Sequence, residues 1–123
     1  MGDPPRTSRP AAGTLAPAEL PSRLVELSAD TRAAVLLDGS GEVAAASGTA
    51  GDAELGDRAR ELLRAVDRAA SEPPSELEAQ VLGGSVFAVR RPHWTLVAVA
   101  RRSALSSLML YDMRALLDSL EDA

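Results

Sequence analysis

The spacing of hydrophobic positions changes several times along the chain between a helical and a strand period. Residues 17–29 place their leucines close to one helical face, which predicts a short helix beginning near Pro21. Residues 33–38 are apolar with little alternation, a pattern typical of a strand covered on both faces. Glycines in the segment 39–41 predict a turn, because glycine accepts the positive φ that many hairpin loops require. Residues 42–47 then return as a second strand.

A long amphipathic helix and three more strands are predicted in the second half of the chain. Residues 52–71 carry their apolar side chains on one helical stripe, and two prolines follow soon after. Strands are predicted at residues 76–82, 85–90 and 94–100. The pair of glycines between the first two of these strands indicates a two-residue hairpin loop. The second half is therefore predicted to be a helix followed by a three-stranded meander.

The pairing of these three strands can be predicted from their hairpins. If Leu82 faces Ser85 and Arg91 faces Trp94, the alternating side chains divide into two apolar faces. One face then carries Leu77, Ala79, Val81, Val86, Ala88, Val97 and Val99. The other face carries Phe87, Val89, Trp94, Leu96 and Ala98. Because the strand at 94–100 is apolar on both faces, we expect it in the middle of the sheet.

The last predicted helix begins at a Ser103 cap and carries an apolar band wider than half of its circumference. The band consists of Leu105, Leu108, Met109, Met113, Leu116, Leu117 and Leu120. Burying such a set contributes about 10–20 kcal/mol, whereas ordering about 18 residues costs on the order of 27 kcal/mol. The helix must therefore lie on the sheet. The core positions predicted from this packing are Leu96, Val97, Val99, Leu108 and Leu116.

The element order is α-β-β-α-β-β-β-α, and the length of 123 residues allows one domain. Residues 1–16 are rich in Pro, Gly, Ser and Ala and have little to bury, so we expect a disordered tail there. Residues 17–123 are expected to form one α/β domain with helices on both faces of its sheet. A domain of this size has a modest core and gains stability from a partner.

The composition excludes many kinds of catalytic and cofactor-binding site. The chain has no Cys, its 13 basic residues are all Arg, and it has one His. Thiolate metal sites, disulfides, lysine nucleophiles and Schiff bases are therefore excluded. Ser106 and Ser107 have no nearby base and no oxyanion motif. We expect no enzyme activity, no cofactor and no metal.

Charge and hydropathy narrow the partners and the location. The net charge is −5 and the sequence pI is about 4.8, without a basic stripe. This balance disfavours binding to nucleic acid or to an anionic membrane. No stretch approaches about 18 consecutive apolar residues, and the start lacks the apolar core of a signal peptide. The expected location is the cytoplasm.

A basic segment around the last strand is the first candidate for a binding site. Residues 90–102 contain no acid and form a candidate anion-accepting patch for an acidic partner surface. The candidate residues of this patch are Arg90, Arg91, His93, Arg101 and Arg102. The favoured alternative is a solvated hairpin tip with Arg91 opposite Glu76, because exposed charges usually contribute little. His93 is expected to be an ordinary turn residue, since no second His or Cys completes a metal site.

Two acids are also conspicuous beside apolar segments. Asp38, even together with Glu42, lacks the run of oxygen donors of a calcium loop, so we expect it to form the turn. Asp112, beside Tyr111, interrupts the apolar band of the last helix. We expect it to be solvated, with contact to a partner or to the tail as the alternative.

Several segments carry a resemblance to a known family. Residues 34–43, Ala-Val-Leu-Leu-Asp-Gly-Ser-Gly-Glu-Val, followed by Ala-Ser-Gly at 46–48, resemble the opening pattern of the Roadblock family of dynein light-chain and bacterial MglB-like domains. Ser-Ala-Leu at 103–105, leading into an apolar helix, is similar to the family's closing helix. The resemblance covers about residues 18–121.

The resemblance implies a Roadblock/profilin-like fold with a five-stranded antiparallel sheet. It also implies homodimerisation and the regulation or scaffolding of a small Ras-like GTPase, without catalysis by the domain itself. No partner-binding residue is transferred to this chain, because the surfaces that bind a GTPase vary across the family.

A homodimer is predicted around the middle helix and the strand at 76–82. In the family-like strand order this strand is an edge, and it carries neither Lys nor Pro, the usual protection of exposed edges. A twofold axis would pair two such edges and bring two middle helices side by side. The predicted interface residues are Leu55, Arg58, Leu62, Val66, Glu78 and Gln80.

The alternative function is a small-molecule sensor domain of the PAS or GAF kind, which has a related α/β layout. The chain has one Phe, one Trp and one Tyr, few aromatic residues to line a ligand pocket. The adaptor is therefore the favoured hypothesis.

Overall fold

A five-stranded antiparallel sheet with helices on both faces forms the domain, as predicted. The computed structural model describes residues 15–48, 52–81 and 83–120. The strand order is β2-β1-β5-β4-β3, so β5 occupies the middle as expected. The elements are a 3₁₀ turn η1 (Pro17–Glu19), α1 (Leu20–Leu27), β1 (Thr31–Asp38), β2 (Val43–Gly48), α2 (Asp52–Ala69), β3 (Glu76–Val81), β4 (Gly84–Arg90), β5 (Trp94–Ala100) and α3 (Ser106–Asp118).

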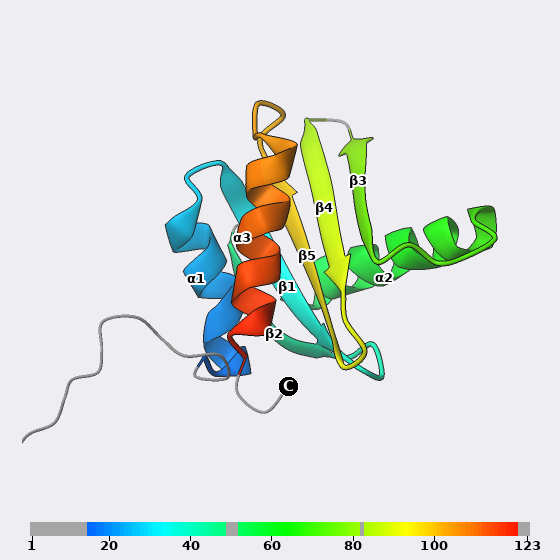
Figure 1. Ribbon diagram of the computed structural model, residues 1–123, viewed down its shortest axis with the longest axis horizontal. Coiled ribbons are helices and arrows are strands. Elements are labelled where there is room, and N and C mark those ends of the chain that lie inside the picture. The colour runs from blue at the N-terminus through cyan, green and yellow to red at the C-terminus, as the bar shows by residue number, and fades with distance from the viewer. Residues whose placement is uncertain (1–14, 49–51, 82, 121–123) are drawn as a thin grey trace, which may run out of the picture.

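The sheet separates two apolar layers. Helices α1 and α3 lie side by side on one face, and α2 lies on the other (Figure 1). The layer under α1 and α3 is the larger, and it contains Leu20, Leu24, Ala34, Leu36, Phe87, Val89, Leu96, Ala98, Met109, Met113, Leu116, Leu117 and Leu120. The layer under α2 contains Ala33, Val35, Leu37, Leu55, Ala59, Ala88 and Val97. The predicted division of the strand residues between two faces is confirmed.

The register of the β3–β4 hairpin differs from the prediction. Ser85 pairs with Gln80, and Val81 pairs with Gly84, so Ser85 does not face Leu82. The loop therefore lies one residue earlier than the glycine pair, and Gly83 takes the positive φ of 89°. Because the partner of Ser85 moves by two residues, each side chain keeps its predicted face. The other hairpin follows the prediction, with the Arg91 N–H donating to the Trp94 carbonyl at 2.7 Å.

The packed part of the chain begins before residue 17, earlier than expected. Leu15 is buried in the layer under α1 and α3, and its N–H donates to the Ser119 carbonyl at 2.7 Å. The expected tail at 1–16 is therefore too long, and residues 1–14 lie outside the described residues. The sequence gives little signal for this contact, because a single leucine is too short a pattern to define an element.

Helix α3 begins later and is buried on a narrower face than predicted. Ser103 is exposed and does not cap the helix; the N-cap position is Leu105, which provides no side-chain cap. Leu108, predicted to be a core residue, is 55% exposed. Leu96, Val97 and Leu116 are buried as predicted, and Val99 is half-buried against the α2 layer. A straight helix buries only the side that touches the sheet, so an apolar band wider than that side extends into solvent.

Asp38 forms the turn between β1 and β2, as predicted. Its Oδ1 accepts hydrogen bonds from the Ser40 N–H at 2.9 Å, the Ser40 Oγ–H at 2.7 Å and the Glu42 N–H at 3.1 Å. Gly41 adopts a φ of 89°, which is accessible to glycine and strained for other residues. The carboxylate therefore closes the turn by replacing backbone acceptors.

Candidate dimerisation surface

The face of the sheet under α2 is only partly covered. Helix α2 makes its closest backbone contacts with β1 and β2, and its far end extends past β3 (Figure 1). Between α2 and the remaining strands is an open hollow of about 620 Å³. Its walls are formed by Leu55, Arg58, Ala59, Glu61 and Leu62 from α2, and by Val81, Val86, Val97 and Val99 from the sheet. The lining of the hollow is therefore mainly aliphatic, with two charged side chains on the side formed by α2.

The position of α2 depends on a glycine at its contact with β2. A Cβ atom added to Gly56 would overlap Cγ2 of Val43. Valine is stiff at χ1, so this neighbour has little freedom to move away. Gly56 therefore allows the helix to lie close to β2, and the same close approach leaves the hollow open over the other strands.

Three of the predicted dimer residues line the hollow. Leu55 is buried, Leu62 is half-buried, and Arg58 is exposed and paired with Glu54 at 3.3 Å. Val66 is half-buried farther along α2. The sequence did not indicate the hollow itself, because the stripe on α2 does not reveal which strands the helix covers.

The edge strand β3 lies beside this hollow. Val81 at its end lines the hollow and is 37% exposed. The predicted interface residues Glu78 and Gln80 are exposed on the strand, and the Gln80 amide donates to the Glu78 carboxylate at 3.3 Å. Strand β3 pairs with β4 through an unbroken register from Glu76 to Val81. Its outer side is therefore a regular row of backbone groups on which another strand can pair.

The opposite edge of the sheet is built differently. Strand β2 carries a bulge, because Leu36 pairs with Ala45 and Leu37 pairs with Val43. The 3₁₀ turn η1 and helix α1 also pack along β2. Bulges and covering segments are the usual means of blocking an exposed edge. The two edges thus differ, and β3 is the one open to further pairing.

The predicted basic patch does not exist as one surface. The first residues of β5 pair with Asp38 and the last with Thr31, so the strand separates Arg90, Arg91 and His93 at one end from Arg101 and Arg102 at the other. Neighbours in sequence become distant when a strand of this length runs between them.

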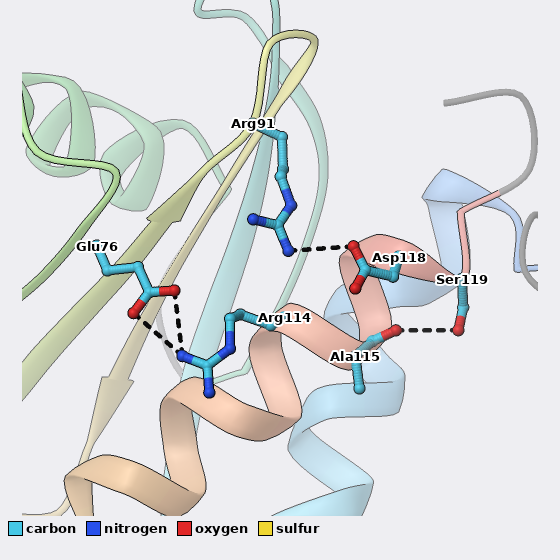
Figure 2. Close-up of polar contacts among 6 residues, drawn as sticks. All are labelled: Glu76, Arg91, Arg114, Ala115, Asp118 and Ser119. Atoms are coloured by element: carbon cyan, nitrogen blue, oxygen red, sulfur yellow. Dashed lines mark hydrogen bonds and ion pairs between the residues drawn. The ribbon is translucent and has the colours of Figure 1, made fainter.

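Most of these arginines already have partners within the domain. Arg90 forms an ion pair with Asp67 at 2.9 Å, and Arg91 forms one with Asp118 at 3.1 Å (Figure 2). Arg102 donates to the Val81 carbonyl at 3.3 Å. His93 is exposed at the β4–β5 turn.

The predicted pairing of Arg91 with Glu76 is also wrong. Glu76 lies opposite Val89 across the strands, and its carboxylate binds Arg114 of α3 (Figure 2). The pattern of α3 gave no indication that Arg114 would reach an edge strand, because a helix stripe does not define which strand lies beneath it.

The electrostatic environment of two acids departs from that of free Asp. The pKa of Asp38 is lowered, first by the Ser40 hydroxyl and then by backbone N–H groups of Glu42 and Ser40. Burial raises the pKa of Asp112. In the part of the chain that the structure describes, no group of three or more His, Cys, Asp or Glu side chains is placed to hold a metal ion.

No family model and no curated protein matches the sequence. Among solved structures, a Roadblock/LC7 domain from Streptomyces avermitilis superposes with a TM-score of 0.69 at 23% identity, over 85% of this chain and 94% of that chain. The chain has a Roadblock fold.

Other Roadblock-fold structures extend the comparison. MglB from Myxococcus xanthus superposes with a TM-score of 0.69 at 13% identity, over 83% of this chain and 82% of that chain. An MglB with a tetrameric arrangement superposes with a TM-score of 0.67 at 19% identity, over 92% of this chain and 94% of that chain. The predicted Roadblock fold, including its α-β-β-α-β-β-β-α order, is therefore confirmed.

Proposed function

We propose that this chain is a non-catalytic homodimeric adaptor or regulator that binds a small Ras-like GTPase. The observation that carries the proposal is the open edge of β3 beside the aliphatic hollow under α2. The Roadblock resemblance implies the same two properties, self-association and a GTPase partner.

The dimer would pair the open edge of β3 and cover the hollow under α2 at the same time. A twofold axis beside β3 pairs this strand with its copy and extends the sheet across two protomers. The same axis brings Leu62 and Val66 of one α2 next to the hollow of the other protomer, whose walls include Val81 and Val86. Burying aliphatic side chains there gives about 25 cal/mol per Å² of apolar surface. The tetrameric arrangement of an MglB supports self-association in proteins of this fold.

The absence of cysteine makes crosslinking a clean test of the dimer surface. Single variants Glu78→Cys and Gln80→Cys place a thiol on β3, and Ala44→Cys places one on the opposite edge as a matched control. A short bismaleimide should link two copies through position 78 or 80 and leave the position 44 variant monomeric on denaturing gels. Equal crosslinking at all three positions, or crosslinking at position 44 alone, would contradict the proposed interface.

The GTPase partner is tested separately. The purified chain would be immobilised and exposed to small Ras-like GTPases of the same organism, loaded with GDP or with a non-hydrolysable GTP analogue. We expect saturable binding that prefers one nucleotide state, since a regulator must distinguish the two. Phosphate release in the presence of the chain then shows whether hydrolysis changes. If the chain is dimeric and yet binds none of these GTPases in either state, the regulatory role is wrong.

The chain is proposed to act by binding alone and to reside in the cytoplasm. Within the residues that the structure covers, no helix is long and apolar enough to cross a membrane. Its acidic character and its internally paired arginines favour a protein partner over nucleic acid or an anionic lipid surface.

The hollow under α2 also favours the sensor hypothesis, because its volume of about 620 Å³ falls in the range of ligand pockets. A thermal-shift screen with nucleotides and metabolites distinguishes the two functions. A sensor's ligand raises the melting temperature of the isolated chain, whereas an adaptor is stabilised by its protein partner. The mainly aliphatic and open walls of the hollow make the second outcome our expectation.

A further inference from the structure

A second apolar surface lies on the face of the domain opposite α2. Five large hydrophobic side chains are exposed in the described residues, and four of them belong to the α1–α3 layer. The fifth, Val81, lines the hollow already described. The four are Leu27 at 55%, Leu105 at 68%, Leu108 at 55% and Tyr111 at 63% exposure. Clustered apolar side chains on a folded surface mark interaction sites.

Leu105, the N-cap of α3, and two residues of the helix form one stripe on this surface. Leu105, Leu108 and Asp112 are spaced by three and four positions, which places them on one side of the helix. The Ser28 Oγ–H lies 3.5 Å from the Met109 sulfur, so the end of α1 packs beside this part of α3. Leu27, next to Ser28, therefore stands at the same end of the helix pair.

Asp112 is an unusual member of an apolar stripe. Burial raises its pKa, and no hydrogen bond or neighbouring cation among the described residues offsets that effect. A partly desolvated carboxylate without a partner is unfavourable, and an opposing cation relieves it. The stripe thus combines apolar contact area with one specific charge requirement, the combination typical of residues that dominate protein interfaces.

The remaining parts of the sequence do not provide the apolar cover that the two leucines lack. Residues 1–14 contain two cations, Arg6 and Arg9, but no Leu, Ile, Val or aromatic side chain, and residues 121–123 add two more acids. Arg114, the basic residue within α3, is engaged by Glu76. The apolar cover of the stripe therefore comes from another molecule.

We propose that Leu105, Leu108 and Asp112 dock an amphipathic helix of a partner protein. The apolar side chains of that helix lie on the two leucines, and a Lys or Arg of the helix pairs with Asp112. The sheet separates this surface from α2 and from the hollow beneath it, so it is distinct from the hollow that the proposed dimer covers. The proposal does not depend on the proposed GTPase.

A displayed peptide library tests the proposal directly. Its members are amphipathic helices of about four turns with a leucine stripe. One central position varies among Lys, Arg, Ala, Glu and Asp. The library is selected on the full chain and counter-selected on the Leu108→Glu variant. We expect Lys or Arg to be enriched at the varied position on the wild-type chain. On the Asp112→Lys variant, which carries the opposite charge at an otherwise unchanged surface, we expect Glu or Asp instead.

The best peptide is then measured by fluorescence anisotropy. It should bind the wild-type chain at least about tenfold more tightly than Asp112→Lys. The Glu42→Arg variant, which reverses the charge of an exposed acid outside both proposed surfaces, serves as a matched control and should bind like wild type. The proposal is overturned if no peptide survives counter-selection. It is also overturned if the wild-type chain and the Asp112→Lys variant select the same charge at the varied position. A loss of molecular mass on Leu108→Glu substitution, without peptide, overturns it in favour of a second copy of this chain.

Discussion

Arg114 on α3 donates to both carboxylate oxygens of Glu76 on β3, with its Nη1 3.1 Å from each (Figure 2). Glu76 is the first residue of the edge strand, so this contact ties the start of β3 to the helix layer. The contact also holds one edge carboxylate on the helix side of the sheet. The ion pair therefore helps to hold in place the edge strand on which the proposed dimer depends.

Removal of this contact should have a small effect on stability. The two side chains are 39% and 32% exposed, and half-exposed ion pairs are worth about 0.2–1 kcal/mol. We expect Arg114→Met and Glu76→Gln each to lower the free energy of unfolding by up to about 1 kcal/mol, and the double variant to show less than their sum. Urea denaturation of wild type, the two single variants and the double variant measures these free energies of unfolding. Strict additivity would show that the two residues do not interact in solution.

Two leucines of the same helix should respond very differently to truncation. Leu116 is 8% exposed and lies in the core, whereas Leu108 is 55% exposed. Leu116→Ala should cost about 2–5 kcal/mol, and Leu108→Ala should cost less than about 1 kcal/mol. Chemical denaturation of the two variants provides the comparison. Similar losses would mean that α3 lies on the sheet with a different face.

Gly56 should be intolerant of even one methyl group. Alanine favours helices over glycine by about 1 kcal/mol, yet its Cβ would overlap Val43. We expect Gly56→Ala to lower stability by about 1–3 kcal/mol, because the helix must move away from β2. The double variant Gly56→Ala with Val43→Ala removes the overlap and should recover part of the loss. Thermal melts of wild type and the two variants would refute this if Gly56→Ala alone were more stable than wild type.

The β1–β2 turn should weaken in acid through Asp38. Its hydrogen bonds lower the pKa of the folded state below that of the unfolded chain. The stabilisation is therefore complete above the ordinary Asp pKa, and it is lost as pH falls through the lowered value. Asp38→Asn keeps an oxygen acceptor but does not titrate, so it is the matched control. The stability advantage of wild type over this variant should shrink between about pH 7 and about pH 2. An advantage that grows in acid would contradict the assignment.

The fold was largely predictable because its elements have strong local patterns. The unalternating segment at 33–38 and the doubly apolar strand at 94–100 indicated buried strands, and β1 and β5 lie inside the sheet. The hairpin register at Ser85 was not predictable, since a shift of two residues leaves the two-residue alternation unchanged.

The candidate surfaces were less predictable, because they depend on packing between distant segments. The basic segment from Arg90 to Arg102 looked continuous in sequence, yet a strand divides it. Leu105 and Leu108 are exposed because α3 buries a narrower face than its apolar band, and the band alone did not define which face that is. Such properties are set by tertiary contacts, on which the sequence pattern carries little information.

The dimer is the central claim, and the molecular mass in solution tests it most directly. The chain has a mass of 12.8 kDa, and sedimentation equilibrium at high micromolar concentration should give twice this value. A mass of 12.8 kDa under those conditions would contradict the dimer and with it the proposed role of β3 and α2.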